Sequence, residues 1–264
     1  ITQPEPADSQ PVTGEVAGSP VHLACAGDGG PTVLFLTDAG LATDGWLDST
    51  VPDRVAAETR ACVYDRPGLG ESPIGALVAD QPTTVESQAA DLAALLASAG
   101  IDEPVVLVAH GYGAHVARVF GRDHLGSTGA MVLVDPPLWE LTADPGSQGP
   151  DATAIEEINA NMGGYGSAAL PVPPVPVIVI APDRSLGLPT RPLAGDLEES
   201  DGIAPELLVP SVQERELRQE NLARKSPFGR FFVQEGSGPA VQFWYPEVVT
   251  EAITEVLADP NLRA

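Results

Sequence analysis

Histidine is the side chain most often used for proton transfer in enzymes, and this chain holds all of its histidines in the first half. They are His22, His110, His115 and His124. No spacing of histidine, cysteine, aspartate and glutamate is typical of zinc, so we expect no metal and no other cofactor. A reaction that needs an imidazole from the C-terminal half of the chain has none available.

The only cysteines are Cys25, in VHLACAG, and Cys62, in TRACVYD. Both segments have the composition of strands, so the two thiols can form a disulfide in an oxidising compartment. The alternative is two buried thiols. In the loop-closure model, a bridge over a loop of this length adds roughly 4 kcal/mol to the free energy of unfolding.

Short apolar runs alternate with helical patterns from about Pro20 onward, which predicts a single α/β domain. We expect a mostly parallel central sheet of about eight strands with helices on both faces. The expected strands are 21–27, 32–37, 60–65, 105–110, 130–135, 175–181 and 229–235, and TGEVAG before them is a candidate antiparallel edge strand. The expected helices are 87–100, 112–123, 211–225 and 246–259.

Three segments lack these patterns. Residues 1–19 are rich in proline and acidic side chains and are expected to be a disordered spacer before the domain at 20–264. Residues 137–174 are expected to form a lid-like insertion, and residues 182–210 a second irregular segment. The chain begins without a methionine, a positively charged segment or an apolar segment, as a mature protein does after its signal has been removed. We therefore expect an exported protein whose signal or anchor is not in this chain.

The segment VVLVAHGYGAHVARVF (105–120) resembles the nucleophile elbow of the α/β-hydrolase superfamily, in which G-x-S-x-G places a serine on a strained turn. In this chain the five positions are Ala109 to Gly113, and Gly111 stands where the serine belongs. VYDRPGLGESP (63–73), VLFLTDAGLATDGW (33–46) and VLVDPP (132–137) support the same resemblance in the same order. The resemblance covers roughly residues 20–258 and implies the α/β-hydrolase fold without its nucleophile.

A second catalytic position is also altered. The resemblance places the triad histidine in the turn of FFVQEGSGPAVQFWYPEVV (231–249), where this chain has Pro239. Proline has neither an imidazole nor a backbone N–H. Asp183 occupies the place of the triad acid, without a serine or histidine to orient. The vestigial positions are therefore Gly111, Asp183 and Pro239, and no catalytic residue is assigned.

The same resemblance implies a binding surface around the old pocket. The N–H of Tyr112 and an N–H near Leu41 are expected to form an anion-binding pair, with space where the serine oxygen would lie and with Asp38 opposing a bound anion. The candidate binding residues are Gly40, Leu41, Gly111, Tyr112 and Trp244. His110 is expected to pack or orient, and Asp135 to end a strand.

Composition limits the partners. The chain has 13 basic and 37 acidic residues, a formal net charge of −24, and a single lysine, Lys225. Nucleic acid binding draws on clustered lysine and arginine, so it is not expected. The acidic surface is expected to keep the protein soluble in a salty or extracellular setting. The alternative is an acidic face that steers a basic partner.

Three functions remain open. The first is a non-catalytic relative in the cell envelope or outside the cell that binds a lipid, an acyl-bearing molecule or a protein partner. The second is a hydrolase with a non-standard catalytic set, for example Asp38, His110 or Asp183. The third is a structural scaffold that binds nothing.

Overall fold

Eight strands form one sheet in the computed structural model, which describes residues 10–73, 83–137, 172–183, 212–238 and 240–262. The strand order is β1-β2-β4-β3-β5-β6-β7-β8. The strands are β1 (Gln10–Val16), β2 (Ser19–Ala26), β3 (Val33–Leu36), β4 (Ala61–Tyr64), β5 (Val105–His110), β6 (Thr128–Val134), β7 (Val177–Pro182) and β8 (Gly229–Gln234). β1 and β2 run antiparallel and the later strands are parallel, so the predicted mostly parallel sheet is confirmed.

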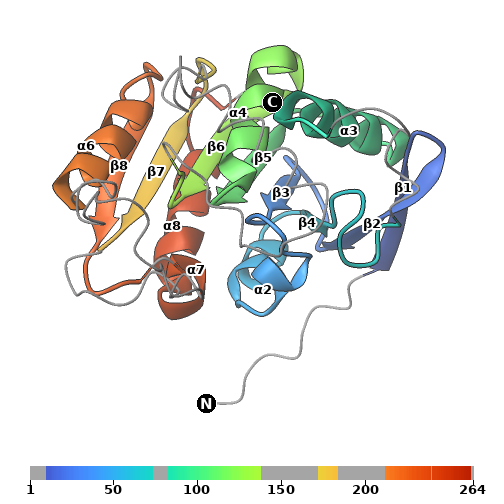
Figure 1. Cartoon of the computed structure of the whole chain (residues 1–264), viewed down its shortest axis with the longest axis horizontal. Coiled ribbons are helices and arrows are strands. Elements are labelled where there is room, and N and C mark those ends of the chain that lie inside the picture. The colour runs from blue at the N-terminus through green and yellow to red at the C-terminus, as the bar shows by residue number, and fades with distance from the viewer. Residues whose placement is uncertain (1–9, 74–82, 138–171, 184–211, 239, 263–264) are drawn as a thin grey trace, which may run out of the picture.

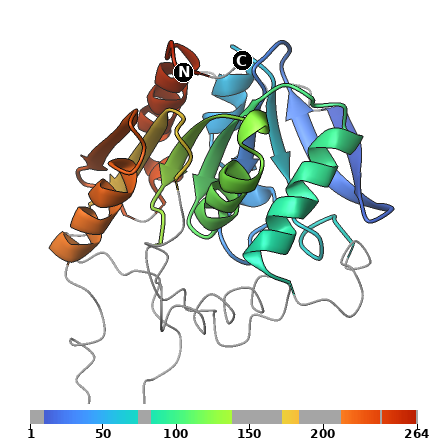
Figure 2. The same cartoon turned by 90° about the horizontal axis from the view of Figure 1, so that it is seen from above.

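Helices cover both faces of this sheet, as Figures 1 and 2 show. One layer holds α3 (Val85–Ser98), α4 (Gly113–Asp123) and α6 (Val212–Ala223), and a short 3₁₀ turn, η2 (Leu125–Ser127), follows α4. The other holds α1 (Asp44–Leu47), α2 (Val51–Ala56), α7 (Val241–Trp244) and α8 (Pro246–Leu257). Strand side chains alternate between the layers: Leu107 and Ala109 pack under α4, and Val106 and Val108 pack toward α8.

The first strand corrects one expectation. β1 begins at Gln10 and pairs with β2 through a turn at Ala17 and Gly18, which have φ of 51° and 78°. Two positive φ values are what a two-residue hairpin turn needs to match the strand twist. The disordered spacer predicted for residues 1–19 is therefore wrong for residues 10–19, and the edge strand expected at TGEVAG is confirmed. Residues 1–9 lie outside the described residues.

The predicted disulfide is present. Cys25 of β2 lies directly opposite Cys62 of β4 in the antiparallel register, and the two sulfurs are bonded. The bridge ties the antiparallel edge of the sheet to the strand next to its centre. It closes a sequence separation of 37 residues.

Helix α3 begins earlier than the sequence pattern predicts. Thr84 caps it: the Thr84 hydroxyl accepts from the N–H of Ser87, and the Ser87 hydroxyl accepts from the N–H of Thr84, each at 2.9 Å. The apolar spacing used for the prediction starts after this cap, which explains the two-residue difference at the start of the helix.

Two predicted irregular regions are largely outside the described residues. Of the lid-like range 137–174, the structure describes 137 and 172–174. Of the range 182–210, it describes 182 and 183. In the described part of the chain, no helix is long and apolar enough to cross a membrane.

Candidate functional site

The segment that resembles a nucleophile elbow has the predicted strand-turn-helix geometry. β5 ends at His110, α4 begins at Gly113, and Gly111 between them has φ of 53°. This left-handed backbone angle favours glycine. The turn is anchored because Gly111 N–H donates to Val134 of the neighbouring strand β6 at 3.1 Å. A Cβ at residue 113 would lie 2.7 Å from the Thr37 carbonyl, so Gly113 allows α4 to approach the end of β3.

The side chain of Asp38 occupies this turn. Oδ1 of Asp38 accepts a hydrogen bond from Tyr112 N–H at 2.6 Å and a second from Ala39 N–H at 2.8 Å. A Cβ added at Gly111 would overlap the carboxyl group of Asp38. The carboxylate therefore lies where a side chain at the elbow would begin, and it uses both backbone donors at once.

These contacts correct the predicted anion-binding pair. The Leu41 N–H donates to the Asp38 backbone carbonyl at 3.2 Å, in a tight turn where Gly40 has φ of 68°. The loop donor that converges with Tyr112 N–H is the N–H of Ala39, which the sequence analysis did not identify. The space expected at the serine position is filled by Asp38. Aspartate commonly accepts from backbone N–H groups just after it, and this tendency could have indicated the contact with Ala39.

Arg66 fixes the loop that carries Asp38. Its two terminal nitrogens donate to the carbonyls of Thr37 and Asp38, each at 2.8 Å, and its side chain is 1% exposed. The guanidinium also lies over the Tyr112 ring, 5.4 Å from the centroid. The Tyr112 hydroxyl donates to Gln88 on α3 at 2.9 Å. Together these contacts hold the Asp38 loop and the elbow against each other.

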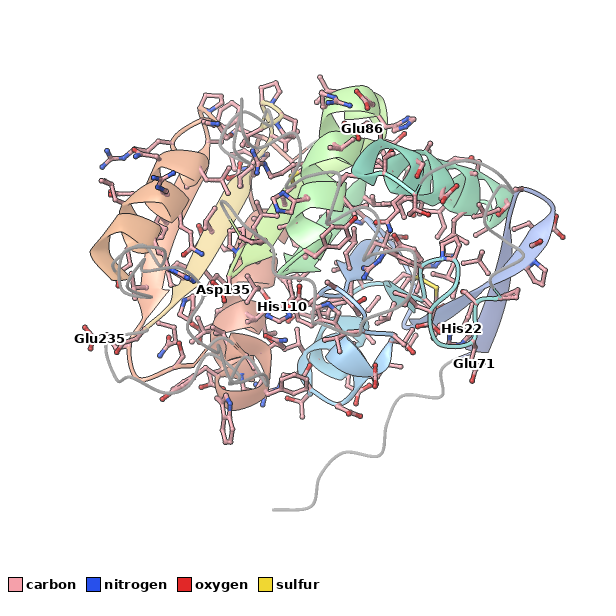
Figure 3. The ribbon with its side chains drawn as sticks, in the orientation of Figure 1. His22, Glu71, Glu86, His110, Asp135 and Glu235 are labelled. Atoms are coloured by element: carbon pink, nitrogen blue, oxygen red, sulfur yellow. A yellow bond between two sulfur atoms is a disulfide. The ribbon has the colours of Figure 1, made fainter. Side chains whose placement is uncertain are left out.

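The segment VYDRPGLGESP is built around a carboxylate that is fully buried, that of Asp65. Asp65 accepts from Thr43 N–H at 2.6 Å and from Glu71 N–H at 2.9 Å. Oδ2 of Asp65 also lies 3.0 Å from Nδ1 of His22. Figure 3 shows His22 beside Glu71 and far from His110 at the elbow. Asp65 thus shapes the turn that presents Arg66, and its role here is structural.

His110 packs beneath the elbow, as expected. It is 8% exposed, its Nδ1 lies 3.2 Å from the Gln242 side-chain nitrogen, and Trp46 meets it edge to face at 6.4 Å. Figure 3 shows His110 close to Asp135, at the ends of the adjacent strands β5 and β6. Asp135 has φ of 45° and accepts from Gln219 at 3.1 Å, which links the end of β6 to α6.

His115 is fully enclosed in α4. Burial, assisted by the nearby Arg118, lowers the pKa of His115 to about 3, and burial alone lowers that of Arg118 to about 9. His115 is therefore neutral at physiological pH. His124 lies at the end of α4 with its ring 5.0 Å from that of Phe120.

Asp183 lies at the end of β7, against the turn that follows β8. Its Oδ2 accepts from Gly236 N–H at 3.0 Å, and its own N–H donates to Gln234 at 3.1 Å. Pro239, the position implied for the triad histidine, lies outside the described residues. Trp244 is 73% exposed, whereas Gln242 is buried against His110, so Gln242 is the residue of α7 that reaches the elbow.

Among the described residues, no group of three or more histidine, cysteine, aspartate and glutamate side chains is placed to hold a metal ion. The arrangement at the elbow is instead an anion hole that the chain itself occupies. The N–H groups of Ala39 and Tyr112 converge on the Asp38 carboxylate, and buried Arg66 holds the loop that carries it. Such a site can hold a negative oxygen, and here the chain supplies it.

Comparison with known proteins places this geometry in context. No protein-family model matches the chain. A thermophilic esterase from Thermogutta terrifontis is similar in structure, with a TM-score of 0.64 and 21% identity, over 95% of this chain and 98% of the esterase. A variant of AqdC, which recognises and cleaves the ring of the Pseudomonas quinolone signal, has a TM-score of 0.67 and 16% identity, over 95% of this chain and all of that chain.

Sequence relatives cover less of the chain. A protein of Gibberella zeae described as an AB hydrolase superfamily protein is 33% identical over 91 residues, which are 34% of this chain and 26% of that protein. The matched segments span between 18% and 44% of the curated relatives' own lengths. These likenesses establish the fold and leave the activity open.

Proposed function

We propose that this chain, which has the α/β-hydrolase fold, is a non-catalytic binding protein of the cell envelope. The observation that carries the proposal is the Asp38 carboxylate seated at Gly111 on the N–H groups of Ala39 and Tyr112. In an acyl-transfer enzyme of this fold, two such donors bind the oxygen that becomes negative in the transition state. A resident carboxylate competes with that oxygen.

The loss of nucleophile and base supports the same proposal. Gly111 supplies no hydroxyl, and no histidine follows residue 124. Removing a triad nucleophile or base costs on the order of 10⁶-fold in turnover, and binding and the oxyanion hole leave about 10³–10⁴ over water. With Asp38 in the hole, that residual contribution is reduced as well. The esterase activity of the Thermogutta terrifontis relative is therefore not carried over to this chain.

The disulfide supports the location, because such bonds persist in oxidising compartments. The partner classes in this proposal are a lipid, an acyl-bearing molecule or an envelope protein. Native mass spectrometry of the protein purified from its source tests for such a partner, since a co-purified small molecule or subunit adds a defined mass.

The catalytic part of the proposal is tested with a fluorophosphonate probe and a short-chain nitrophenyl ester, using a serine esterase of the same fold as the positive control. We expect no covalent labelling and no turnover above the background rate. Turnover of around 1 s⁻¹ or more by the wild-type protein would contradict the proposal and favour a catalytic set built on Asp38, His110 or Asp183.

A further inference from the structure

The two oxygens of the Asp38 carboxyl group have different surroundings. Oδ1 is held by the N–H groups of Ala39 and Tyr112. No donor from the described residues forms a hydrogen bond to Oδ2, and Asp38 itself is only half-buried. Oδ1 thus anchors the carboxyl group, and Oδ2 can accept a hydrogen bond from a ligand.

This second oxygen lies where the fold binds ligands. Asp38 follows β3, and Gly111 follows β5, so the carboxylate stands at the carboxyl ends of two adjacent parallel strands. Ligands of open α/β sheets bind in the crevice outside these ends. Since Gly111 has no side chain, no atom of residue 111 beyond the backbone covers the carboxylate.

The charge of the chain favours a cation at this oxygen. Arg66 is bound to the backbone carbonyls of Thr37 and Asp38 and is 1% exposed, so it braces the loop from the buried side. The whole chain carries a net charge of −24. An approaching anion is repelled, and a cation is attracted.

We infer that this site binds an ammonium group, which donates a charge-assisted hydrogen bond to Oδ2 of Asp38. The inference rests on the proposed non-catalytic function. In an oxyanion hole, two backbone N–H groups bind a negative oxygen of the substrate. Here the N–H groups of Ala39 and Tyr112 bind the Asp38 carboxylate instead, and this carboxylate can bind a positive nitrogen. An amine that carries an alkyl or acyl tail belongs to the lipid class proposed above.

The experiment uses n-hexylammonium, hexanoate and methyl hexanoate as probes with the full chain. Amide chemical shifts of Ala39 and Tyr112 are followed by NMR during each titration. We expect saturable shifts with hexylammonium, and at least tenfold weaker binding of hexanoate and of the uncharged ester.

The decisive variant is Asp38→Asn. Its carbonyl oxygen can still accept from the N–H groups of Ala39 and Tyr112, so the turn is kept, while an NH₂ donor replaces Oδ2. Hexylammonium binding should weaken at least tenfold. The matched control is Asp48→Asn, which makes the same charge change on an exposed residue just after α1 and should alter binding less than threefold.

Two results would overturn the inference: no amide shifts with hexylammonium up to about 10 mM, or equal losses in Asp38→Asn and Asp48→Asn. Ester turnover is measured on the same preparations. Turnover by the wild type would contradict the proposed function itself, whereas absent turnover together with absent amine binding would contradict only the ammonium site.

Discussion

The carboxyl group of Asp38 occupies the space that a side chain at Gly111 would need. A Cβ at residue 111 would overlap the carboxyl group of Asp38, and Oδ2 would lie only 2.6 Å away. The carboxylate can remain on the N–H groups of Ala39 and Tyr112 only while residue 111 is glycine. The substitutions at the two positions therefore have to be interpreted together.

Gly111→Ser should destabilise the protein without making it an esterase. The new Cβ displaces the Asp38 carboxylate and leaves two backbone donors without their partner, at a cost of roughly 1–3 kcal/mol. Urea unfolding measures the loss. Gly100→Ser is the control, because Gly100 has φ of 68° and a Cβ there meets nothing within 4 Å, so it measures the cost of the left-handed backbone angle alone, which is about 1–2 kcal/mol. Equal effects of the two variants would refute the pairing of Gly111 with Asp38.

Restoring catalysis should require three changes. From the sequence, Gly111→Ser with Pro239→His is the smallest set that returns a nucleophile and a base, with Asp183 orienting the new imidazole. The structure adds Asp38→Gly, because a carboxylate displaced by the serine Cβ would still lie beside the two backbone donors and would repel the negative oxygen that forms there. We expect nitrophenyl ester turnover above background in the triple variant only. A double variant as active as the triple would show that Asp38 does not obstruct the hole.

Asp38→Ala and Asp38→Asn should differ in stability. Alanine leaves the N–H groups of Ala39 and Tyr112 without an acceptor and should lower the free energy of unfolding by roughly 1–3 kcal/mol. Asparagine keeps one acceptor oxygen and should cost clearly less. Urea titrations of both variants beside the wild type provide the measurement, and identical midpoints for the two would argue against the contact at Oδ1.

Replacing Cys25 and Cys62 together by alanine should lower the free energy of unfolding by roughly 4 kcal/mol, because the unfolded chain regains the entropy of the open loop. Dithiothreitol should destabilise the wild type and leave the double variant unchanged. Two titratable thiols in the non-reduced protein from its source would contradict both the bridge and the oxidising location.

His115 should contribute to unfolding in acid. Its pKa is lowered to about 3 in the folded protein against an ordinary value of 6.5, so the unfolded state binds a proton first as the pH falls. The stability due to neutral His115 is present above pH 6.5 and is lost progressively from there toward pH 3. In His115→Gln, the unfolding free energy should fall less steeply over this window. An unchanged slope would show that His115 is not the titrating group.

The fold class, the strand-turn-helix at residues 105–120 and the pairing of Cys25 with Cys62 were all predicted from the amino-acid sequence. These features depend on local patterns: apolar runs of strand length, a glycine at a strained turn, and two cysteines in neighbouring strands. The sequence also determined that no histidine is available in the C-terminal half. The spacing of apolar residues did not predict the Thr84 cap or the start of β1 at Gln10, because the residues at these ends are polar and do not contribute to that spacing.

The group that occupies the elbow could not be predicted from the sequence, because it comes from a distant segment of the chain. Asp38 and Tyr112 are 74 positions apart in the chain, and their hydrogen bond exists because β3 and β5 pair in parallel and bring their carboxyl ends together. Arg66 joins them from a third strand end, after β4. A sequence pattern shows which residue types are present, but the direction of a carboxylate depends on strand register and on donors from distant segments.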